Sequence, residues 1–131
     1  MHKVFVYGSL LSGMGNHGLL KDAVFVGKTT SPPEFLMIDI GYFPGVIEHD
    51  KGMPIVGEVY EVTDEQLNRL DILEGYRSSN PEGGLYNRRE IDTEFGKALI
   101  YVYNNHFGRN TTNYVPFGDW KTHYNKKTGR I

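Results

Sequence analysis

The sequence predicts an α+β protein in which a closed or strongly curved sheet of six to seven short strands packs against helices. Short runs of β-branched and aromatic residues recur between turn-forming Gly, Pro, Asn and Ser. One segment, residues 64–74, has a convincing helical pattern. The strict alternation of strands and helices that marks a doubly wound parallel sheet is missing. The chain of 131 residues predicts a single domain, residues 1–131.

Seven segments have the composition and boundaries of strands. They are rich in Val, Ile, Phe and Tyr and end at turn residues, and they comprise residues 3–7, 23–30, 34–40, 46–49, 55–62, 85–94 and 97–103. The glycine-rich residues 11–18 predict a loop with one helical turn after Asn16. Residues 77–84, which contain two Ser, Asn, Pro and two Gly, predict a second and longer loop.

The predicted helix, residues 64–74, carries a signal at each end. Thr63 followed by Gln66 is a capping-box pattern, and Gly75 is a typical helix stop. A stripe of Leu67, Leu70 and Leu73 should pack against the core.

The remainder, residues 104–131, is polar and predicts an irregular segment with Tyr114, Phe117 and Trp120 as aromatic anchors. Lysines and an arginine follow from about residue 121, and we expect a flexible basic tail there. Contact of this tail with RNA is a less favoured interpretation, because such tails are more often solvated.

Composition limits the classes of function. The net charge is −2, so no basic field indicates nucleic acid as a partner. The chain has no cysteine, which excludes a disulfide framework and a thiolate nucleophile. No apolar run has the length of a membrane span, and no signal-peptide pattern precedes the first strand. We therefore expect a cytoplasmic protein without a membrane or nucleic-acid partner.

Three motifs are weak on inspection. Residues 13–18 match G-x-G-x-x-G, but they leave no room for the crossover helix of a dinucleotide fold. The five histidines are scattered, so no metal site is predicted: His2, His17, His49, His106 and His123. Ser9 lacks the G-x-S-x-G context of a nucleophile elbow. The Gly8-Ser9 turn better suits backbone N–H groups that hold an anion.

Glu74 is the residue that folding alone does not explain. It lies about 40° from the centre of the leucine stripe and at the negative end of the helix dipole. Burial and the dipole both raise the pKa of a carboxyl group, a combination typical of reactive sites. A half-solvated carboxylate at a helix end is an equally good interpretation from periodicity alone. Asp71, one turn earlier, is either an acid–base partner or, more plausibly, a structural partner of Arg88 or Arg89.

Several motifs in order resemble the γ-glutamylcyclotransferase-like family, in the branch of γ-glutamylamine cyclotransferases and AIG2-like proteins. The resemblance spans residues 4–120 and rests on Val4-Phe5-Val6-Tyr7-Gly8-Ser9-Leu10, Asn16, Phe43-Pro44-Gly45, Leu70-Asp71-Ile72-Leu73-Glu74-Gly75-Tyr76, Leu85-Tyr86-Asn87-Arg88 and Gly118-Asp119-Trp120.

This resemblance implies a small mixed β-barrel with flanking helices. It also implies an enzyme that releases 5-oxoproline and an amine from a small γ-glutamyl substrate, without a metal or other cofactor. The family's catalytic glutamate falls on Glu74, and its glutamyl-binding loop falls on Tyr7, Gly8, Ser9 and Leu10. Tyr86 and Arg88 match a Y-x-R pair expected near the pocket or bracing it, and Tyr7, Tyr76 and Tyr86 are candidate aromatic walls.

Two points leave the function open at this stage. The 77–84 loop is longer than expected for the γ-glutamylamine branch, so the leaving-group side of the pocket can differ. The same pocket would also suit a non-catalytic module that binds a small acyl-amino ligand. An inward Glu74 favours the enzyme, because a second negative charge would not help an anion-binding pocket.

Overall fold

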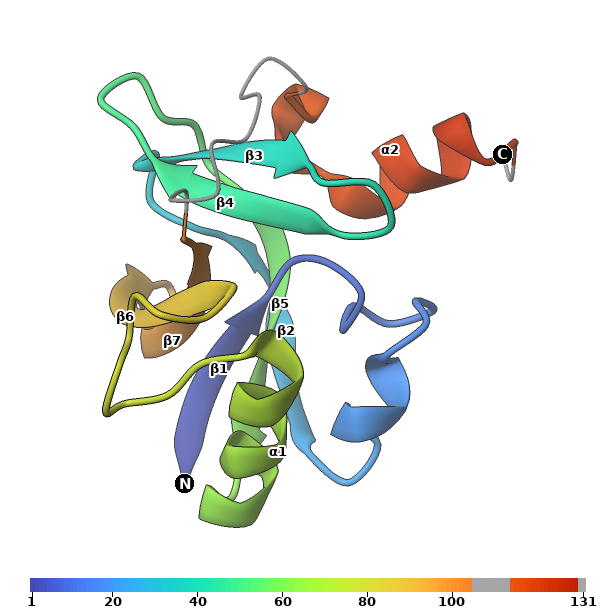
Figure 1. The fold of residues 1–131 in the computed structure, drawn as a ribbon. Coiled ribbons are helices and arrows are strands. Elements are labelled where there is room, and N and C mark those ends of the chain that lie inside the picture. Colours follow the sequence, from blue (N-terminus) through green and yellow to red (C-terminus); the bar gives the residue numbers. More distant parts are fainter. Residues whose placement is uncertain (105–113, 130–131) are drawn as a thin grey trace.

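The computed structural model describes residues 1–104 and 114–129. In this part of the chain seven strands form two sheets (Figure 1). The larger sheet has the order β2 (Val24–Thr30), β5 (Val56–Val62), β1 (His2–Val6), β7 (Gly96–Tyr103) and β6 (Tyr86–Thr93). The smaller is the hairpin of β3 (Phe35–Asp39) and β4 (Pro44–Glu48). Each predicted strand therefore exists, with ends within two residues of those predicted.

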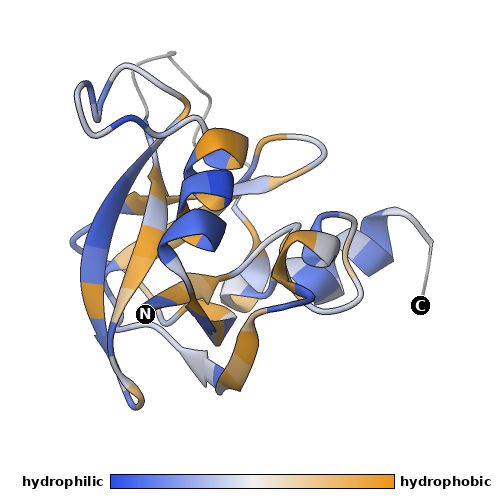
Figure 2. Cartoon of the chain, turned by 90° about the horizontal axis from the view of Figure 1, so that it is seen from below, coloured by the Kyte–Doolittle hydropathy of each residue, from blue (hydrophilic) through white to orange (hydrophobic). Residues whose placement is uncertain are grey.

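The strand pairing mixes the two directions. β1 pairs antiparallel with β5 and parallel with β7, while β2–β5 and β6–β7 are antiparallel. Bands of hydrophobic and hydrophilic residues alternate along the strands, as Figure 2 shows. Because β1 lies between β5 and β7, it is the central strand of the larger sheet, and it leads directly into the predicted site.

Of the two predicted alternatives, a closed or a strongly curved sheet, the closed β-barrel is wrong for the described residues, since the strands form two separate sheets. The large sheet is nevertheless curved enough for its edges to meet at one end. The Thr29 hydroxyl on β2 donates to the Glu94 carboxylate in the β6–β7 turn, at 2.5 Å. The Phe95 ring covers Gly27, where a Cβ atom would collide with it. The side chains make this contact without a backbone ladder to close the sheet.

The helix α1 (Asp64–Glu74) has the predicted bounds and packs on the larger sheet. Thr63 and Gln66 form the capping box, and Gly75 ends the helix in the left-handed conformation with φ 70°. Leu67 and Leu70 are buried, but Leu73 is 41% exposed. The leucine stripe was therefore predicted correctly for its first two members and not for the third.

The C-terminal segment is more regular than predicted. Residues 120–127 form a second helix, α2 (Trp120–Lys127), after the short 3₁₀ segment η3 (Pro116–Gly118). The Asp119 carboxylate caps α2, and the Trp120 side chain is fully buried. His123 and Lys127 both bond to Asp39 at the end of β3, which holds α2 beside the hairpin (Figure 1). The prediction of an irregular segment is wrong over this helix, and residues 105–113 and 130–131 lie outside the described part.

Two apolar clusters hold the layers together. One packs α1 and the 3₁₀ segment η1 (His17–Leu20) on the sheet, and it includes Val4, Val6, Leu20, Tyr60, Val62, Leu67 and Leu70. The other packs the hairpin and α2 on the sheet, and it includes Phe5, Phe35, Val46, Val59, Ile100 and Trp120. Neither described helix is long and apolar enough to cross a membrane.

Candidate active site

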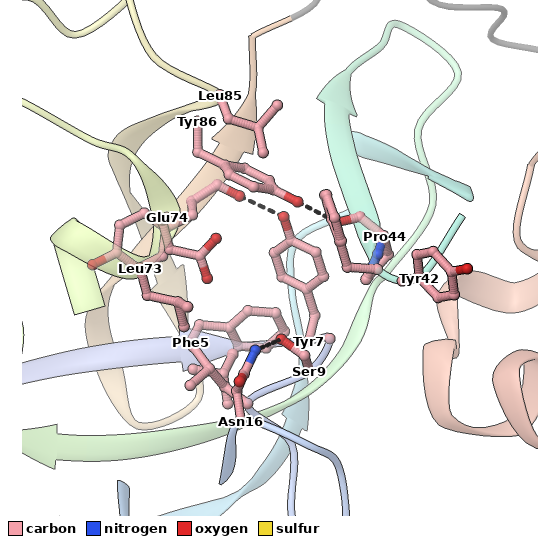
Figure 3. A pocket seen from close by; sticks show the side chains of 15 residues that line it. Phe5, Tyr7, Ser9, Asn16, Tyr42, Pro44, Leu73, Glu74, Leu85 and Tyr86 are labelled. Atoms are coloured by element: carbon pink, nitrogen blue, oxygen red, sulfur yellow. Dashed lines mark hydrogen bonds between the residues drawn. The ribbon is translucent and has the colours of Figure 1, made fainter. Parts of the chain in front are cut away.

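A cavity of about 330 Å³ lies where the end of β1, the end of α1 and the β3–β4 turn meet (Figure 3). Its walls are mainly aromatic and apolar, with few polar groups. The lining comprises Phe5, Val6, Tyr7, Gly8, Ser9, Leu10, Asn16, Tyr42, Phe43, Pro44, Leu73, Glu74, Leu85, Tyr86 and Tyr101. This composition is typical of a small-molecule site.

Glu74 is the carboxylate of this cavity. It is the last residue of α1, and the N–H of Gly75 closes the helix onto the carbonyls of Asp71 and Ile72. In Figure 3 the Glu74 side chain points inward across the cavity from Tyr7 and Ser9. Leu73 lines the cavity beside it, which explains why this leucine is missing from the core.

The surroundings of Glu74 favour its protonated form. Burial raises the pKa of Glu74 to about 7 from the ordinary value of 4.5, and the nearby Asp71 carboxylate adds to the rise. The carboxyl group can therefore both accept and donate a proton near neutral pH.

Asp71 has the structural role predicted for it. Its two carboxylate oxygens accept hydrogen bonds from Arg88 Nη1 and from the Tyr101 hydroxyl, each at 2.6 Å. Asp71 does not line the cavity, so the geometry does not favour an Asp71–Glu74 acid–base pair. Arg89, the alternative partner, pairs instead with Glu34 and Glu48.

The turn after β1 brings two backbone donors to the lining of the cavity. The carbonyl of Gly8 accepts from the N–H of Leu11 at 3.0 Å, and the carbonyl of Ser9 accepts from the N–H of Asn16 at 2.8 Å. In a trans peptide the C=O and the following N–H point in opposite directions, and the described chain has no cis bond. The N–H groups of Ser9 and Leu10 therefore point away from the loop. No acceptor in the described part of the chain bonds to them.

Gly8 permits this turn to pack against the hairpin. A Cβ atom at this position would lie 2.8 Å from Pro44 Cδ, so a side chain would push the turn and the hairpin apart. Asn16 adds a second hold on the turn, because its Nδ2 donates to the Ser9 hydroxyl at 2.9 Å (Figure 3).

Two buried tyrosines brace the cavity through their hydroxyl protons. Tyr7 donates to the carbonyl of Tyr101 at 2.7 Å, and Tyr86 donates to the carbonyl of Pro44 at 2.5 Å. Burial raises the pKa of both phenols, and the charge of Glu74 raises it further. Both tyrosines thus remain neutral at physiological pH.

The structure brings most of the predicted site residues together. Glu74, Tyr86 and the four loop residues Tyr7, Gly8, Ser9 and Leu10 all line the cavity. Arg88 does not: it pairs with Asp71, and its guanidinium lies 4.6 Å from the centre of the Tyr76 ring. Tyr76 is also outside the lining, so its prediction as an aromatic wall is wrong, and residues 77–84 contribute nothing to the lining.

Sequence reasoning missed Tyr42 and Tyr101 as walls of the cavity. Tyr42 precedes the Phe43-Pro44-Gly45 motif, which was the available signal for this wall. Tyr101 pairs with Arg88 across β6 and β7, a contact that becomes visible only once the register is known.

Neither the scattered histidines nor the glycine-rich loop forms a metal or dinucleotide site among the described residues. Among the described residues, no group of three or more His, Asp or Glu side chains could hold a metal ion, and His106 lies outside those residues. The glycine-rich loop leads into the four-residue segment η1 and then into β2, which pairs antiparallel with β5. The crossover helix to a parallel strand that a dinucleotide site requires does not follow the loop.

Comparison with known proteins places this arrangement in a family. A family model described as "Gamma-glutamyl cyclotransferase, AIG2-like" matches residues 4–122. A Vibrio cholerae protein named provisionally as a γ-glutamylcyclotransferase is 36% identical over 119 residues, which cover 91% of this chain and 95% of the relative. The γ-L-glutamyl-butirosin B γ-glutamyl cyclotransferase of Niallia circulans is 33% identical over 125 residues, which cover 92% of this chain and 76% of the relative.

A solved structure shares the fold. An uncharacterized protein from Pyrococcus horikoshii superposes with a TM-score of 0.78 at 22% identity, covering 98% of each chain. The family model and the two relatives all name γ-glutamyl cyclotransferases. The chain belongs to the γ-glutamyl cyclotransferase, AIG2-like family.

Proposed function

We propose that this protein is a γ-glutamyl cyclotransferase, which cleaves a γ-glutamyl amide by attack of the substrate's own α-amine. The observation that carries the proposal is the meeting of two groups in one cavity. Glu74, with a pKa of about 7, lines the same cavity as Ser9 and Leu10, whose N–H groups have no acceptor among the described residues. These are the groups that the reaction requires: a proton carrier and a site for an oxyanion.

In the proposed reaction, the α-amine nitrogen forms a bond to the γ-carbonyl carbon, and the carbonyl electron pair moves to oxygen. Ionised Glu74 takes the proton that the attacking nitrogen loses. The N–H groups of Ser9 and Leu10 stabilise the oxyanion. The bond to the leaving nitrogen then breaks, and Glu74 returns the proton to that nitrogen. The products are 5-oxoproline and a free amine, and the proton balance on Glu74 is restored.

The cavity walls suit an intramolecular reaction. Because nucleophile and electrophile belong to one molecule, the protein mainly has to fold the substrate into a reactive conformation. Tyr7 and Tyr86 are fixed by their hydrogen bonds to backbone carbonyls, so they form rigid walls against which the glutamyl chain can bend. Arg88 acts from outside the cavity, by holding Asp71 next to the last turn of α1.

A substrate panel tests the proposal. Purified protein is incubated with γ-glutamyl amino acids and γ-glutamyl amines, and 5-oxoproline is measured by mass spectrometry. We expect 5-oxoproline from at least one class, and no release from analogues whose α-amine is acetylated, since they lack the nucleophile. Saturable binding without any 5-oxoproline would contradict the proposal and favour a non-catalytic binding module.

A further inference from the structure

Outside the cavity, the molecule contains a buried carboxylate that the proposed reaction does not use. Glu58 lies in β5 and is only 6% exposed. Its Oε1 accepts from the N–H of Ser12 and from the Tyr60 hydroxyl, each at 2.9 Å, and its Oε2 accepts from the Ser12 hydroxyl at 2.8 Å. Three donors therefore converge on one side chain, two of them from the loop that follows the Gly8–Leu10 turn.

Glu58 holds these donors as a charged acceptor. Burial alone would raise its pKa, but the hydrogen bonds from Ser12 and Tyr60 and the nearby charge of Lys121 hold the pKa of Glu58 below its ordinary value. Hydrogen bonds to an ionised acceptor are roughly twice as strong as those between neutral groups. Ser12 therefore has charged partners on two sides: the Glu58 carboxylate accepts from its N–H and its hydroxyl, and the Lys121 ammonium donates to its hydroxyl oxygen at 3.3 Å.

Other side chains hold the rest of the loop. Asn16 binds the backbone and hydroxyl of Ser9. His17 Nδ1 lies 2.9 Å from the carbonyl of Leu10, so this nitrogen carries the proton and donates it. The ring of Tyr60, whose hydroxyl binds Glu58, lies against the ring of His17 with centroids 5.8 Å apart. Glu58 and Tyr60 thus support the loop from the sheet, and Asn16 and His17 support it from within.

We propose that Glu58 is a positioning residue, which acts through Ser12 to fix the peptide planes that carry the N–H groups of Ser9 and Leu10 at the lining of the cavity. The inference rests on the proposed function for its catalytic consequence. An oxyanion site contributes only if its donors are aligned before the reaction, because realignment during the reaction would cancel the gain. A buried carboxylate outside the cavity that accepts several hydrogen bonds can hold these donors in alignment.

Glu58→Gln tests this directly. The amide would present a donor where three donors converge, so Ser12 would lose part of its anchor. We expect lower amide order parameters for Ser9 and Leu10 by ¹⁵N relaxation, and a kcat lower by roughly tenfold or more. The rise of kcat with pH near 7 should persist, because Glu74 is untouched. Glu61→Gln is the matched control: Glu61 lies in the same strand with its side chain on the opposite face, and we expect wild-type values.

A double-mutant cycle tests whether Glu58 acts through Ser12. Ser12→Ala should lower kcat, Ser12→Thr should restore it, and Glu58→Gln with Ser12→Ala should be no slower than Glu58→Gln alone. The inference would be overturned if the losses in kcat added up in the double variant. It would also be overturned if Glu58→Gln kept the wild-type kcat or left the amide order parameters of Ser9 and Leu10 unchanged.

The role of Glu58 can still be tested if its Gln variant does not fold or if the wild-type protein has no activity. If Glu58→Gln fails to fold, the Ser12→Ala and Ser12→Thr pair carries both readouts. If the wild-type protein releases no 5-oxoproline from any substrate, the proposed function fails. The order parameters of Ser9 and Leu10 then decide the positioning role alone.

Discussion

At the scale of single residues, Glu74 combines two properties that seldom occur together at a helix end. It is the last residue of α1, and it points into an apolar cavity instead of into solvent. Burial is the larger cause of its raised pKa, and Asp71 is the smaller. A carboxyl group in this position costs the fold free energy whenever it is ionised, and the proposed function explains why it is kept.

Glu74→Gln should stabilise the protein at high pH. The folded-state pKa of Glu74, about 7, exceeds the ordinary 4.5, so the unfolded chain loses the proton first as pH rises. Stability is therefore lost between about pH 4.5 and 7, by about 2–3 kcal/mol after allowance for partial exposure. The variant cannot ionise and should exceed wild type by this amount at about pH 8, and match it near pH 4.

Urea unfolding at several pH values measures this difference. Glu82→Gln, an exposed carboxylate in the 77–84 loop, serves as the control and should leave the pH dependence of stability unchanged. Parallel curves for Glu74→Gln and wild type across the pH range would show that the carboxyl group is not buried as described.

Asp71→Asn should shift the pH dependence of turnover. The Asp71 charge raises the pKa of Glu74, so removing this charge lowers the pKa of Glu74. The increase in rate with pH should therefore begin at a lower pH in the variant than in wild type. The variant should also lose roughly 2–3 kcal/mol of stability, because the partly buried Arg88 loses its charged partner. Profiles of kcat/KM against pH check the direction. Asp64→Asn, on the exposed start of the same helix, should leave the profile in place.

At the scale of elements, α1 was predictable to its last residue because its signals are local. The capping box and the left-handed Gly75 each involve residues within one turn of the helix end. By contrast, α2 was missed. Its eight residues contain a single buried side chain, Trp120, and its hold on Asp39 depends on the hairpin beside it. Only the Asp119 cap was available as a local signal.

The two ends of α1 should respond differently to substitution. Thr63→Ala removes the cap far from the cavity, so we expect a loss of about 1 kcal/mol with unchanged kcat. Gly75→Ala forces a side chain into φ 70°, which costs roughly 1–2 kcal/mol. Because Gly75 follows Glu74 directly, this variant should also lower kcat. Denaturant unfolding and turnover, measured on both variants, check the contrast; equal kcat values would contradict a role for the helix end in placing Glu74.

At the scale of the whole molecule, strand positions could be predicted but their arrangement could not. Hydrophobic runs and turn residues are local signals, whereas the parallel pairing of β1 with β7 joins segments that are far apart in sequence. The closed barrel was wrong for the same reason: whether the edges of a sheet pair depends on its curvature. Here Phe95 over Gly27 and Thr29 with Glu94 bring the edges together through side chains.

The candidate site follows the same division. The turn after β1 and the end of α1 carry recognisable motifs, and both line the cavity. Tyr42 comes from the β3–β4 turn, where the neighbouring Phe43-Pro44-Gly45 motif was the one local signal, and Tyr101 comes from β7, where no local pattern marks it. Glu58 falls within the predicted strand 55–62 without being singled out, since its partner Ser12 lies 46 positions earlier in the chain.

The most direct test of the central claim is the release of 5-oxoproline by wild type and by Glu74→Gln, with the best substrate of the panel. We expect wild type to produce 5-oxoproline and free amine in equal amounts. The Gln variant should be folded, by circular dichroism and urea unfolding, and should lose at least about 100-fold in kcat. A folded Gln variant that keeps the wild-type rate would contradict the role of Glu74 as the proton carrier.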